Sequence, residues 1–529
     1  MKLSTVGRVA PTRGTRLQKL LVVAAASAVA LSVATAMQSK ADTASYAWAG
    51  GLPGCHTSQP ALAHFSPTGF VDPQPAGGPV PCGVSTGYPT NENRIEVTNN
   101  GTVIYMPALL PATDPAVAGG CGHAPGLCTG NTVARSVDGG VSWTTSTANA
   151  HPEGHTFTGD VDNNLYMDHA SGRLFYYDYD SGTVGAQPHI CGNGEGATIF
   201  FSDDNGATWN HGSDLDHSCS ENPTVLVGKS ILKDATWDGG VVYLCGNNFG
   251  TGIGGAGSTG KACSKSLDGG STWVGDQLQG DGSQGAYSGR AKDDAAPYAE
   301  CAGASSSAGN DVQPLSDGTL VVVVPCNGKT YLAQSLDEGR NWSIRNEIPS
   351  GGSLRVDNHD NLYKLNGTLL SASHNGVKWT AEHDMVRPGL KSRGTTFFAQ
   401  GLRATHHQPG RVAVMYYGTL AGHTTADGFI TETRNAFDDQ PMFWTGQVNE
   451  GRPLLTNGPG VNIGITVLDF IGGAYSTDRR SVWASFAQDC GDNLVTDPNC
   501  SRRLPGTNPA DPQDGFAGRL VWSPDTTDG

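Results

Sequence analysis

The sequence predicts an all-β fold: a β-propeller of four-stranded antiparallel blades, with seven blades expected and six as the alternative. The octapeptide pattern Ser-x-Asp-x-Gly-x-x-Trp starts at residues 136, 202, 266 and 335. Copies at near-even spacing indicate a repeated supersecondary unit. The chain has 73 glycines and 30 prolines, and only 16% of its residues are charged. This composition suits many short strands joined by turns, and no long helical stripe of apolar residues competes with it.

Each position of the repeated octapeptide has a physical role in a tight turn. The Ser and Asp side chains can bond backbone N–H groups, the Gly supplies a positive φ, and the Trp ring packs between sheets. The unit therefore predicts a β-hairpin. It resembles the Asp-box, or BNR, repeat of the sialidase superfamily and related β-propellers, in which the boxes lie on outer hairpins far from the active site. We expect the octapeptides to stabilise the blades and to take no part in catalysis.

The blades can be followed along the chain by their strand patterns. The expected strands are 94–98 and 103–106 in blade one; 158–162, 165–166 and 174–177 in blade two; 223–227 and 241–244 in blade three; 311–313 and 320–324 in blade four; 354–357 and 362–363 in blade five; 397–404, 411–417 and 429–431 in blade six; and 467–470, 482–486 and a closing strand at 519–522 in blade seven. A worn octapeptide at 374–379 ends blade five. Residues 476–483 match the pattern only by chance, because Arg480 stands where Gly belongs. Six blades remain the alternative if blade five or seven is incomplete.

Three regions are expected along the chain. Residues 1–41 carry a basic stretch followed by an apolar run, Leu20 to Ala36, and predict a signal peptide and therefore secretion. No later segment is long and apolar enough to predict a membrane span. Residues 42–92 are rich in Pro, Gly and Ser and predict an irregular N-terminal segment pinned by a disulfide. Residues 93–529 form the single propeller domain.

Twelve cysteines follow the signal segment, and an even number in a secreted chain favours disulfides over metal ligands. Pairing neighbours in order gives six local bonds, of which Cys121–Cys128 and Cys490–Cys500 close the shortest loops. The other four are Cys55–Cys82, Cys191–Cys219, Cys245–Cys263 and Cys301–Cys326.

The net charge of the chain limits the classes of partner that we expect it to bind. Removing residues 1–41 removes six basic and no acidic residues, which takes the formal net charge from −16 to −22. An acidic protein repels phosphate backbones, so nucleic-acid binding is not expected. A sugar-acid substrate would need a local basic pocket. No cofactor and no metal site are expected, and the protein is expected to be a monomer.

In a propeller the innermost strand of each blade lines a central channel, so polar residues near its start converge on one face. These positions give the channel-mouth candidates Arg94, Glu96, Asp160, Asp162, Glu221, Asp311, Arg355, Asp357, Arg403 and Asp469. A charge on a mostly apolar strand is more informative than one on a loop. Capping of a blade turn is the competing interpretation for each carboxylate.

The resemblance to sialidases assigns roles to some of these residues. Sialidases bind a substrate carboxylate through three arginines and use an Asp acid/base with a Tyr nucleophile activated by a Glu. Their first arginine lies in an Arg-Ile-Pro motif, where this chain has Arg94-Ile95-Glu96. The resemblance implies Arg94, Arg355 and Arg403 as substrate-binding residues, Asp160 as acid/base, Glu221 as the partner of the tyrosine, and Tyr416 or Tyr417 as nucleophile. The missing proline and the short interval from Arg403 to Tyr417 depart from the family pattern.

Two functions are therefore expected. The first is a secreted sialidase-like glycoside hydrolase that acts on exposed glycans or polysaccharide. The alternative is a non-catalytic propeller that binds a glycan or a protein outside the cell, because fold alone does not settle function. A different carboxylate pair, drawn from Asp160, Asp311 and Asp469, is a third route to catalysis.

Overall fold

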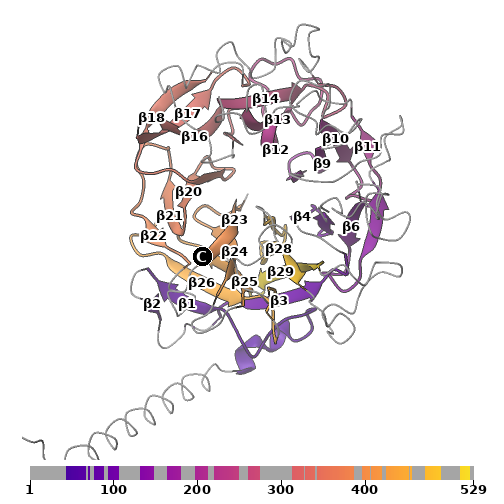
Figure 1. Ribbon diagram of the computed structural model, residues 1–529, viewed down its shortest axis with the longest axis vertical. Helices are drawn as coiled ribbons and strands as arrows, with labels where there is room; N and C mark the ends of the chain where they lie inside the picture. Colours follow the sequence, from indigo (N-terminus) through magenta and orange to yellow (C-terminus); the bar gives the residue numbers. More distant parts are fainter. Residues whose placement is uncertain are drawn as a thin grey trace, which may run out of the picture.

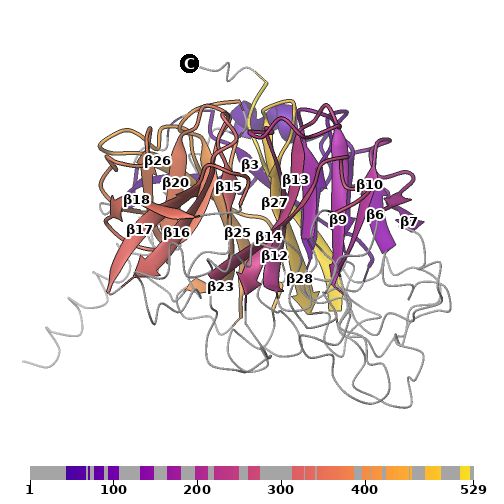
Figure 2. The same cartoon turned by 90° about the horizontal axis from the view of Figure 1, so that it is seen from above.

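Seven antiparallel sheets stand around a central axis in the computed structural model of this protein (Figures 1 and 2). The structure describes residues 43–66, 69–71, 75, 77–88, 93–106, 132–147, 164–179, 197–212, 220–248, 260–273, 312–326, 328–339, 342–386, 396–405, 407–419, 425–451, 453–455, 471–489 and 513–524. The protein is a seven-bladed β-propeller, which confirms the predicted fold class and the larger of the two blade numbers.

Within each blade the strands run outward from the axis in chain order. Blades one to four contain β4 (Arg94–Val97), β5 (Val103–Met106), β6 (Thr132–Ser136) and β7 (Thr144–Thr147); β8 (Asn164–Asp168), β9 (Arg173–Tyr179), β10 (Ala197–Ser202) and β11 (Asn210–His211); β12 (Ser220–Gly228), β13 (Val241–Asn248) and β14 (Gly260–Ser266); and β15 (Gln313–Pro314), β16 (Leu320–Cys326), β17 (Lys329–Ser335) and β18 (Ser343–Ile348).

Blades five to seven complete the ring. They contain β19 (Ser353–Val356), β20 (Leu362–Asn366), β21 (Leu369–Ser373) and β22 (His383–Asp384); β23 (Thr396–Ala404), β24 (Val412–Gly418), β25 (Asp427–Thr433) and β26 (Met442–Gln447); and β27 (Gly473–Tyr475), β28 (Ser481–Asp489) and β29 (Gln513–Val521). In blade two the innermost strand begins at Asn164, later than the expected 158–162, which lie outside the described residues. This shift changes which side chains of blade two face the axis.

The N-terminal segment closes the ring. After the short 3-10 helix η1 (Thr43–Ala49) come β1 (Leu62–Phe65), β2 (Gly69–Phe70) and β3 (Val80–Ser85). β3 pairs with β29 as the outermost strand of blade seven, and β1 pairs with β26 of blade six. The segment expected to be irregular therefore supplies strands. Residues 519–521, expected in a closing strand, belong to the third strand of blade seven.

The four octapeptides lie in the turns after the third strands of blades one to four and share one set of hydrogen bonds. In the first copy Ser136 Oγ donates to Asp138 Oδ1 and accepts from the Gly140 N–H, each at 2.8 Å. The matching Ser–Gly bond is also 2.8 Å in the other three copies. Gly140 has φ 94°, and a Cβ there would lie 2.8 Å from Val84 Cγ2, so this position requires glycine.

The chance match at 476–483 occupies a different turn, between the first and second strands of blade seven. There Asp478 Oδ1 accepts from the Arg480 N–H at 2.9 Å. It is a polar turn, but it is not in the position that the octapeptides occupy.

The hydrophobic core is divided among the interfaces between neighbouring blades. Seven clusters of buried residues each join two adjacent blades around the ring, from the pair of blades one and two to the pair of blades seven and one. The octapeptide tryptophans contribute to them: Trp143, for example, meets the Tyr105 ring edge-on at 6.1 Å. Because a middle strand is covered on both faces, its successive side chains point into two different interfaces.

In the described part of the chain two disulfides join neighbouring cysteines, as the sequence predicts, and the structure gives no side-chain geometry for the expected pairs Cys191–Cys219 and Cys301–Cys326. Cys55–Cys82 attaches the N-terminal segment to β3, and Cys245–Cys263 links the adjacent strands β13 and β14. The expected pairs Cys121–Cys128 and Cys490–Cys500 lie outside the described residues. No helix in the described part of the chain is both long and apolar enough to cross a membrane.

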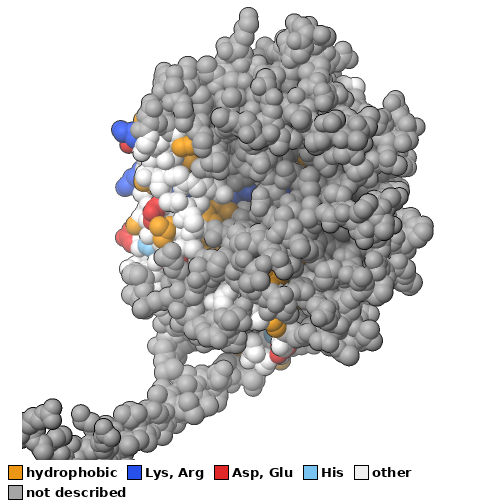
Figure 3. All heavy atoms as spheres, in the orientation of Figure 1, with side chains coloured by type: hydrophobic (Ala, Val, Ile, Leu, Met, Phe, Trp, Pro, Cys, Tyr) orange, Lys and Arg blue, Asp and Glu red, His pale blue; other side chains and the backbone are white. Residues whose placement is uncertain are grey.

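Side chains of different chemical types are interspersed on the described part of the outer surface. In the orientation of Figure 3 it is visible mainly along the edge near blades four and five, where basic, acidic and apolar side chains are interspersed. The exposed pair Lys329 and Glu347, with Nζ and Oε2 2.7 Å apart, belongs to blade four. The net negative charge of the chain is therefore not gathered into one patch on this edge.

Candidate functional site

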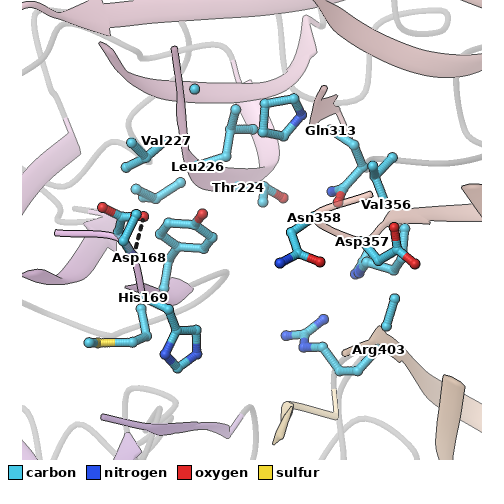
Figure 4. A pocket seen from close by; sticks show the side chains of 18 of the residues that line it. Asp168, His169, Thr224, Leu226, Val227, Gln313, Val356, Asp357, Asn358 and Arg403 are labelled. Carbon is cyan, nitrogen blue, oxygen red and sulfur yellow. Dashed lines mark hydrogen bonds between the residues drawn. The ribbon is translucent and has the colours of Figure 1, made fainter. Parts of the chain in front are cut away.

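A cavity of about 990 Å³ lies at the centre of the ring. The first strands of all seven blades line it, together with the turns that follow several of them (Figure 4). Alternate side chains of an innermost strand face the axis. On β4 this alternation brings Arg94 and Glu96 to the cavity and leaves Ile95 in the core.

Three arginines from three different blades line this one cavity. Arg94 lies on β4, Arg355 on β19 and Arg403 on β23. Backbone carbonyls orient two of them: Arg355 Nη1 donates to the Leu354 carbonyl at 2.6 Å, and Arg403 donates through Nε to the Gly473 carbonyl. In Figure 4 the Arg403 side chain extends into the cavity on the side of Asn358.

Glu96 shares the cavity with these arginines. It follows Arg94 by two positions on β4, so both side chains leave the same face of the strand, and both are 8% exposed. Burial raises the pKa of the Glu96 carboxyl to about 8, although the charges of Arg403 and Arg355 and a hydrogen bond with the Val97 backbone lower it. Burial outweighs the cations, so the carboxyl is mostly protonated at neutral pH.

Tyr166 is a cavity residue that the sequence did not reveal. It lies on β8 between Asn164 and Asp168, and all three line the cavity. Burial is the main cause of its raised pKa, and the nearby carboxylates of Asp168 and Glu96 raise it further. The phenol is therefore a neutral hydrogen-bonding group at physiological pH. We expected residues 165–166 to lie in the second strand of blade two and not in its innermost strand. With the innermost strand placed at 164–168, the alternation of side chains identifies Tyr166 as a candidate.

Neutral polar groups also line the cavity. Thr224 of β12, Gln313 of β15 and Asn358 lie around the cavity in Figure 4. The Gln313 side-chain amide donates to the Val312 carbonyl at 2.9 Å. Hydroxyl and amide groups of this kind can exchange hydrogen bonds with an uncharged polyhydroxyl ligand. The cavity thus combines arginines with neutral donors and acceptors and with acidic residues, which are Glu96, Asp168, Asp238, Asp357 and Asp360.

Asp357 also borders the cavity, but its carboxylate serves the turn between β19 and β20. It accepts hydrogen bonds from the backbone N–H groups of His359 at 2.9 Å and Asn361 at 3.0 Å, and from the Asn361 amide at 2.8 Å. The Tyr363 hydroxyl donates to it at 2.8 Å. The turn-capping interpretation therefore describes this residue.

Tyr416 and Tyr417, expected as alternative nucleophiles, lie in the core and not among the cavity-lining residues. They occupy β24, the second strand of blade six, where Tyr416 faces blade five and Tyr417 faces blade seven. The Tyr416 hydroxyl bonds Thr431 Oγ1 at 3.0 Å, and the Tyr417 hydroxyl donates to the Ala487 carbonyl at 2.9 Å. Burial raises the pKa of both phenols. Their role in this structure is to join neighbouring blades.

The remaining candidates fall where the structure gives no side-chain geometry. Glu221 lies on β12 opposite Asn247, and its side chain is outside the described set. Asp160, Asp162, Asp311 and Asp469 lie outside the described residues. The carboxylates assigned to catalysis therefore stay predictions.

Among the described side chains, no group of three or more His, Cys, Asp or Glu residues is placed to hold a metal ion.

No protein-family model matches the chain, and no curated protein matches it. The solved structures that resemble it include sialidases and other glycoside hydrolases. A protein of unknown function from Dyadobacter fermentans is 14% identical over 83% of this chain and 98% of that chain, with a TM-score of 0.37. An α-L-arabinofuranosidase from Fusarium graminearum is 12% identical over 74% and 98%, with a TM-score of 0.36. A sialidase from Trypanosoma rangeli is 11% identical over 86% and 58%, with a TM-score of 0.34. At these identities and scores the similarities carry no argument about function.

Proposed function

We propose that this protein is a secreted sialidase-like glycoside hydrolase that acts on glycans carrying an acidic sugar. One observation carries the proposal: Arg94, Arg355 and Arg403, from three blades, line a single cavity. Guanidinium groups bind carboxylates through paired hydrogen bonds and stay charged at any physiological pH. In a chain of net charge −16, these three arginines supply the cationic groups that an anionic substrate requires, within a lining that also contains acidic residues such as Asp168 and Asp238.

The rest of the cavity suits a sugar. Its volume of about 990 Å³ is ample for a small-molecule ligand. Thr224, Gln313 and Asn358 offer groups that match sugar hydroxyls, and Tyr166 adds a ring and a neutral phenol. We assign the arginines to the acidic group of the substrate and the neutral polar groups to its hydroxyls.

For the hydrolytic step we retain Asp160 as the acid/base and Glu221 as a second carboxylate. Glycoside hydrolysis needs one group that protonates the leaving oxygen and another that acts on the opposite side of the sugar. Tyr416 and Tyr417 are not proposed as nucleophiles, because both are buried in the core and both hydroxyls are engaged, Tyr416 with Thr431 of its own blade and Tyr417 with the Ala487 carbonyl of blade seven.

Secretion is part of the proposal. It rests on the signal-like segment 1–41 and is supported by the disulfides Cys55–Cys82 and Cys245–Cys263, since such bonds persist in oxidising compartments.

The test is a panel of α- and β-linked glycosides with acidic and neutral terminal sugars, with release of the terminal sugar measured by chromatography. We expect turnover of acidic glycosides, and Arg355→Ala and Arg403→Ala should abolish it. Arg345→Ala is the matched control, because this arginine lies on the exposed strand β18 and donates to the Asn375 carbonyl far from the cavity lining. Turnover of neutral glycosides alone, unaffected by the cavity variants, would contradict the assignment.

A non-catalytic glycan-binding propeller is the second candidate. The burial of both predicted tyrosine nucleophiles favours it. Binding of acidic glycans without turnover, unchanged in Asp160→Ala and weakened in Arg403→Ala, would establish this function in place of hydrolysis.

A further inference from the structure

Glu96 marks the point at which this chain departs from the family motif that it resembles. Glutamate stands third in Arg94-Ile95-Glu96, where the sialidase motif has proline. On β4 the side chain of Ile95 enters the core between blades one and seven, whereas Arg94 and Glu96 line the cavity. The substitution therefore places an ionisable carboxyl inside the proposed binding site.

The charged and titratable groups around this carboxyl come from several elements. Arg94 shares its strand, and Arg355 and Arg403 reach it from β19 and β23. From β8 come Tyr166, Asp168 and, in the following turn, His169.

The other packed elements add little charge. β27 contributes Tyr475 to the cavity lining. The β5 residue Tyr105 pairs with Ile95 and so lies on the opposite face. The described side chains of β28 include Ser485 and Gln488 but no ionisable group. The positive charges that act on the Glu96 carboxyl thus belong to the same arginines that are proposed to bind the substrate.

An ionised Glu96 and an ionised ligand would compete for these arginines. If the carboxyl loses its proton, its negative charge offsets the cations and repels an incoming anion, and the burial of Glu96 weakens the screening of these charges by solvent. If it keeps its proton, the arginines retain their full attraction, and the carboxyl O–H can donate a hydrogen bond to a ligand oxygen. Burial, with a pKa of about 8 in the free protein, places this choice near physiological pH.

We propose that Glu96 is a specificity-determining residue that couples the binding of an anionic sugar to the protonation of its own carboxyl. This inference rests on the proposed function of the cavity. The anion of the bound sugar further favours the protonated form, so above neutrality each binding event takes up a proton from solution. The affinity for acidic sugars then falls as the pH rises, and the affinity for neutral sugars does not.

The test is isothermal titration with sialic acid, glucuronic acid and galactose from about pH 6 to about pH 9.5, in two buffers of different ionisation enthalpy. For the wild-type protein we expect the Kd of the acidic sugars to rise above about pH 8 by up to about tenfold per pH unit, with proton uptake. Glu96→Gln keeps the shape and removes the titration, so its Kd should not change with pH in this range. Glu96→Met, which also fills the site, should behave in the same way if the glutamine variant folds poorly.

Asp360→Asn is the matched control. Asp360 is a second carboxylate at the cavity wall, bonded to the Ser316 N–H at 2.6 Å, and asparagine tolerates its φ of 61°. This variant should keep the wild-type pH dependence.

The outcomes separate the two proposals. If acidic sugars bind with the same pH dependence in the wild type and in Glu96→Gln, the role of Glu96 is overturned and the function stands. If neither the wild type nor any variant binds an acidic sugar at any pH, the role of Glu96 and the proposed function are both overturned.

Discussion

Charged side chains are buried both between blades and in the central cavity, and the two regions treat them differently. Between blades three and four, Lys265 is 2% exposed and its Nζ lies 2.5 Å from Glu338 Oε2 and 3.3 Å from Asp234 Oδ2. Glu338 also accepts the Leu232 N–H at 3.0 Å. In the cavity, three arginines share the lining with Glu96, whose pKa burial raises although the charges of Arg403 and Arg355 lower it. The interface neutralises charge within the protein, whereas the cavity presents charge to a ligand.

Burial of charged side chains serves two purposes in this fold. A buried ion pair with direct contacts fixes how two blades pack, and losing one partner leaves an uncompensated charge. A buried carboxyl beside several cations responds to pH and to ligand charge. Changes in the first region should alter stability, and changes in the second should alter binding and its pH dependence.

The largest expected effect is the change in the free energy of unfolding with pH that the Glu96 carboxyl causes. The folded protein holds the proton up to a pKa of about 8, while the unfolded chain releases it near the ordinary value of 4.5. Folding therefore binds a proton in this window, and the contribution to stability is lost as the pH rises. The free energy of unfolding of the wild type, relative to Glu96→Gln, should fall by about 4 to 5 kcal/mol across the window. Urea denaturation at several pH values measures this, and parallel pH curves for the two proteins would contradict it.

Removing the cation between blades three and four should be the next largest effect. Lys265→Met leaves Glu338 buried without its closest partner, and we expect a loss of about 3 kcal/mol in the free energy of unfolding. The control is Lys329→Met, which breaks the exposed pair with Glu347 and should leave the urea midpoint unchanged. Equal midpoints for both variants would remove the distinction between a buried pair and a surface pair.

A cavity arginine should affect affinity and leave stability nearly unchanged. Arg403→Ala should weaken the binding of an acidic sugar about 10- to 100-fold, because it removes a charge-assisted hydrogen-bond partner. Arg403→Lys should recover only part of this affinity, since an ammonium group cannot form the paired contact. Titration calorimetry gives the affinity and thermal unfolding the stability. A large loss of stability with unchanged affinity would place Arg403 with the interface charges.

The smallest effect is expected in the octapeptides. Ser136→Ala removes the acceptor of the buried Gly140 N–H, and we expect a loss of about 1 kcal/mol in unfolding free energy. Ser142→Ala, at an exposed position of the same turn, should cost less. Neither variant should change the affinity for an acidic sugar, and a change in that affinity would refute the separation of the octapeptides from the site.

The fold could be predicted from the sequence because its signals are local. Each octapeptide carries its own turn chemistry, so four copies fixed the register of four blades. Blade two shows the limit: the innermost strand was expected at 158–162, whereas the structure has β8 at 164–168. Placing an innermost strand requires knowing which strand faces the axis, and Tyr166 was missed for this reason.

The site was harder to predict because its side chains come from distant blades. Their positions near the start of expected innermost strands identified Arg94, Arg355 and Arg403 as candidates, and all three line the cavity. The resemblance to sialidases suggested Tyr416 and Tyr417, but β24 is covered by a blade on each side and both of its faces are core. Asp357 could not be separated from a turn cap until its hydrogen bonds were visible. A sequence pattern shows which side chains share one face of a strand, but it does not show whether that face packs against another blade or lines the cavity.

The pairing of β3 with β29 has a consequence for how the protein is made. The outermost strand of blade seven is synthesised more than 400 residues before its partner. Until the last part of the chain emerges, β3 has no neighbour, and an unpaired strand edge invites association with other chains. Contacts so distant in sequence form slowly. The ring therefore cannot be sealed until synthesis of the chain is nearly complete, and the Cys55–Cys82 disulfide, which lies early in the chain, can fix β3 to the N-terminal segment before that step.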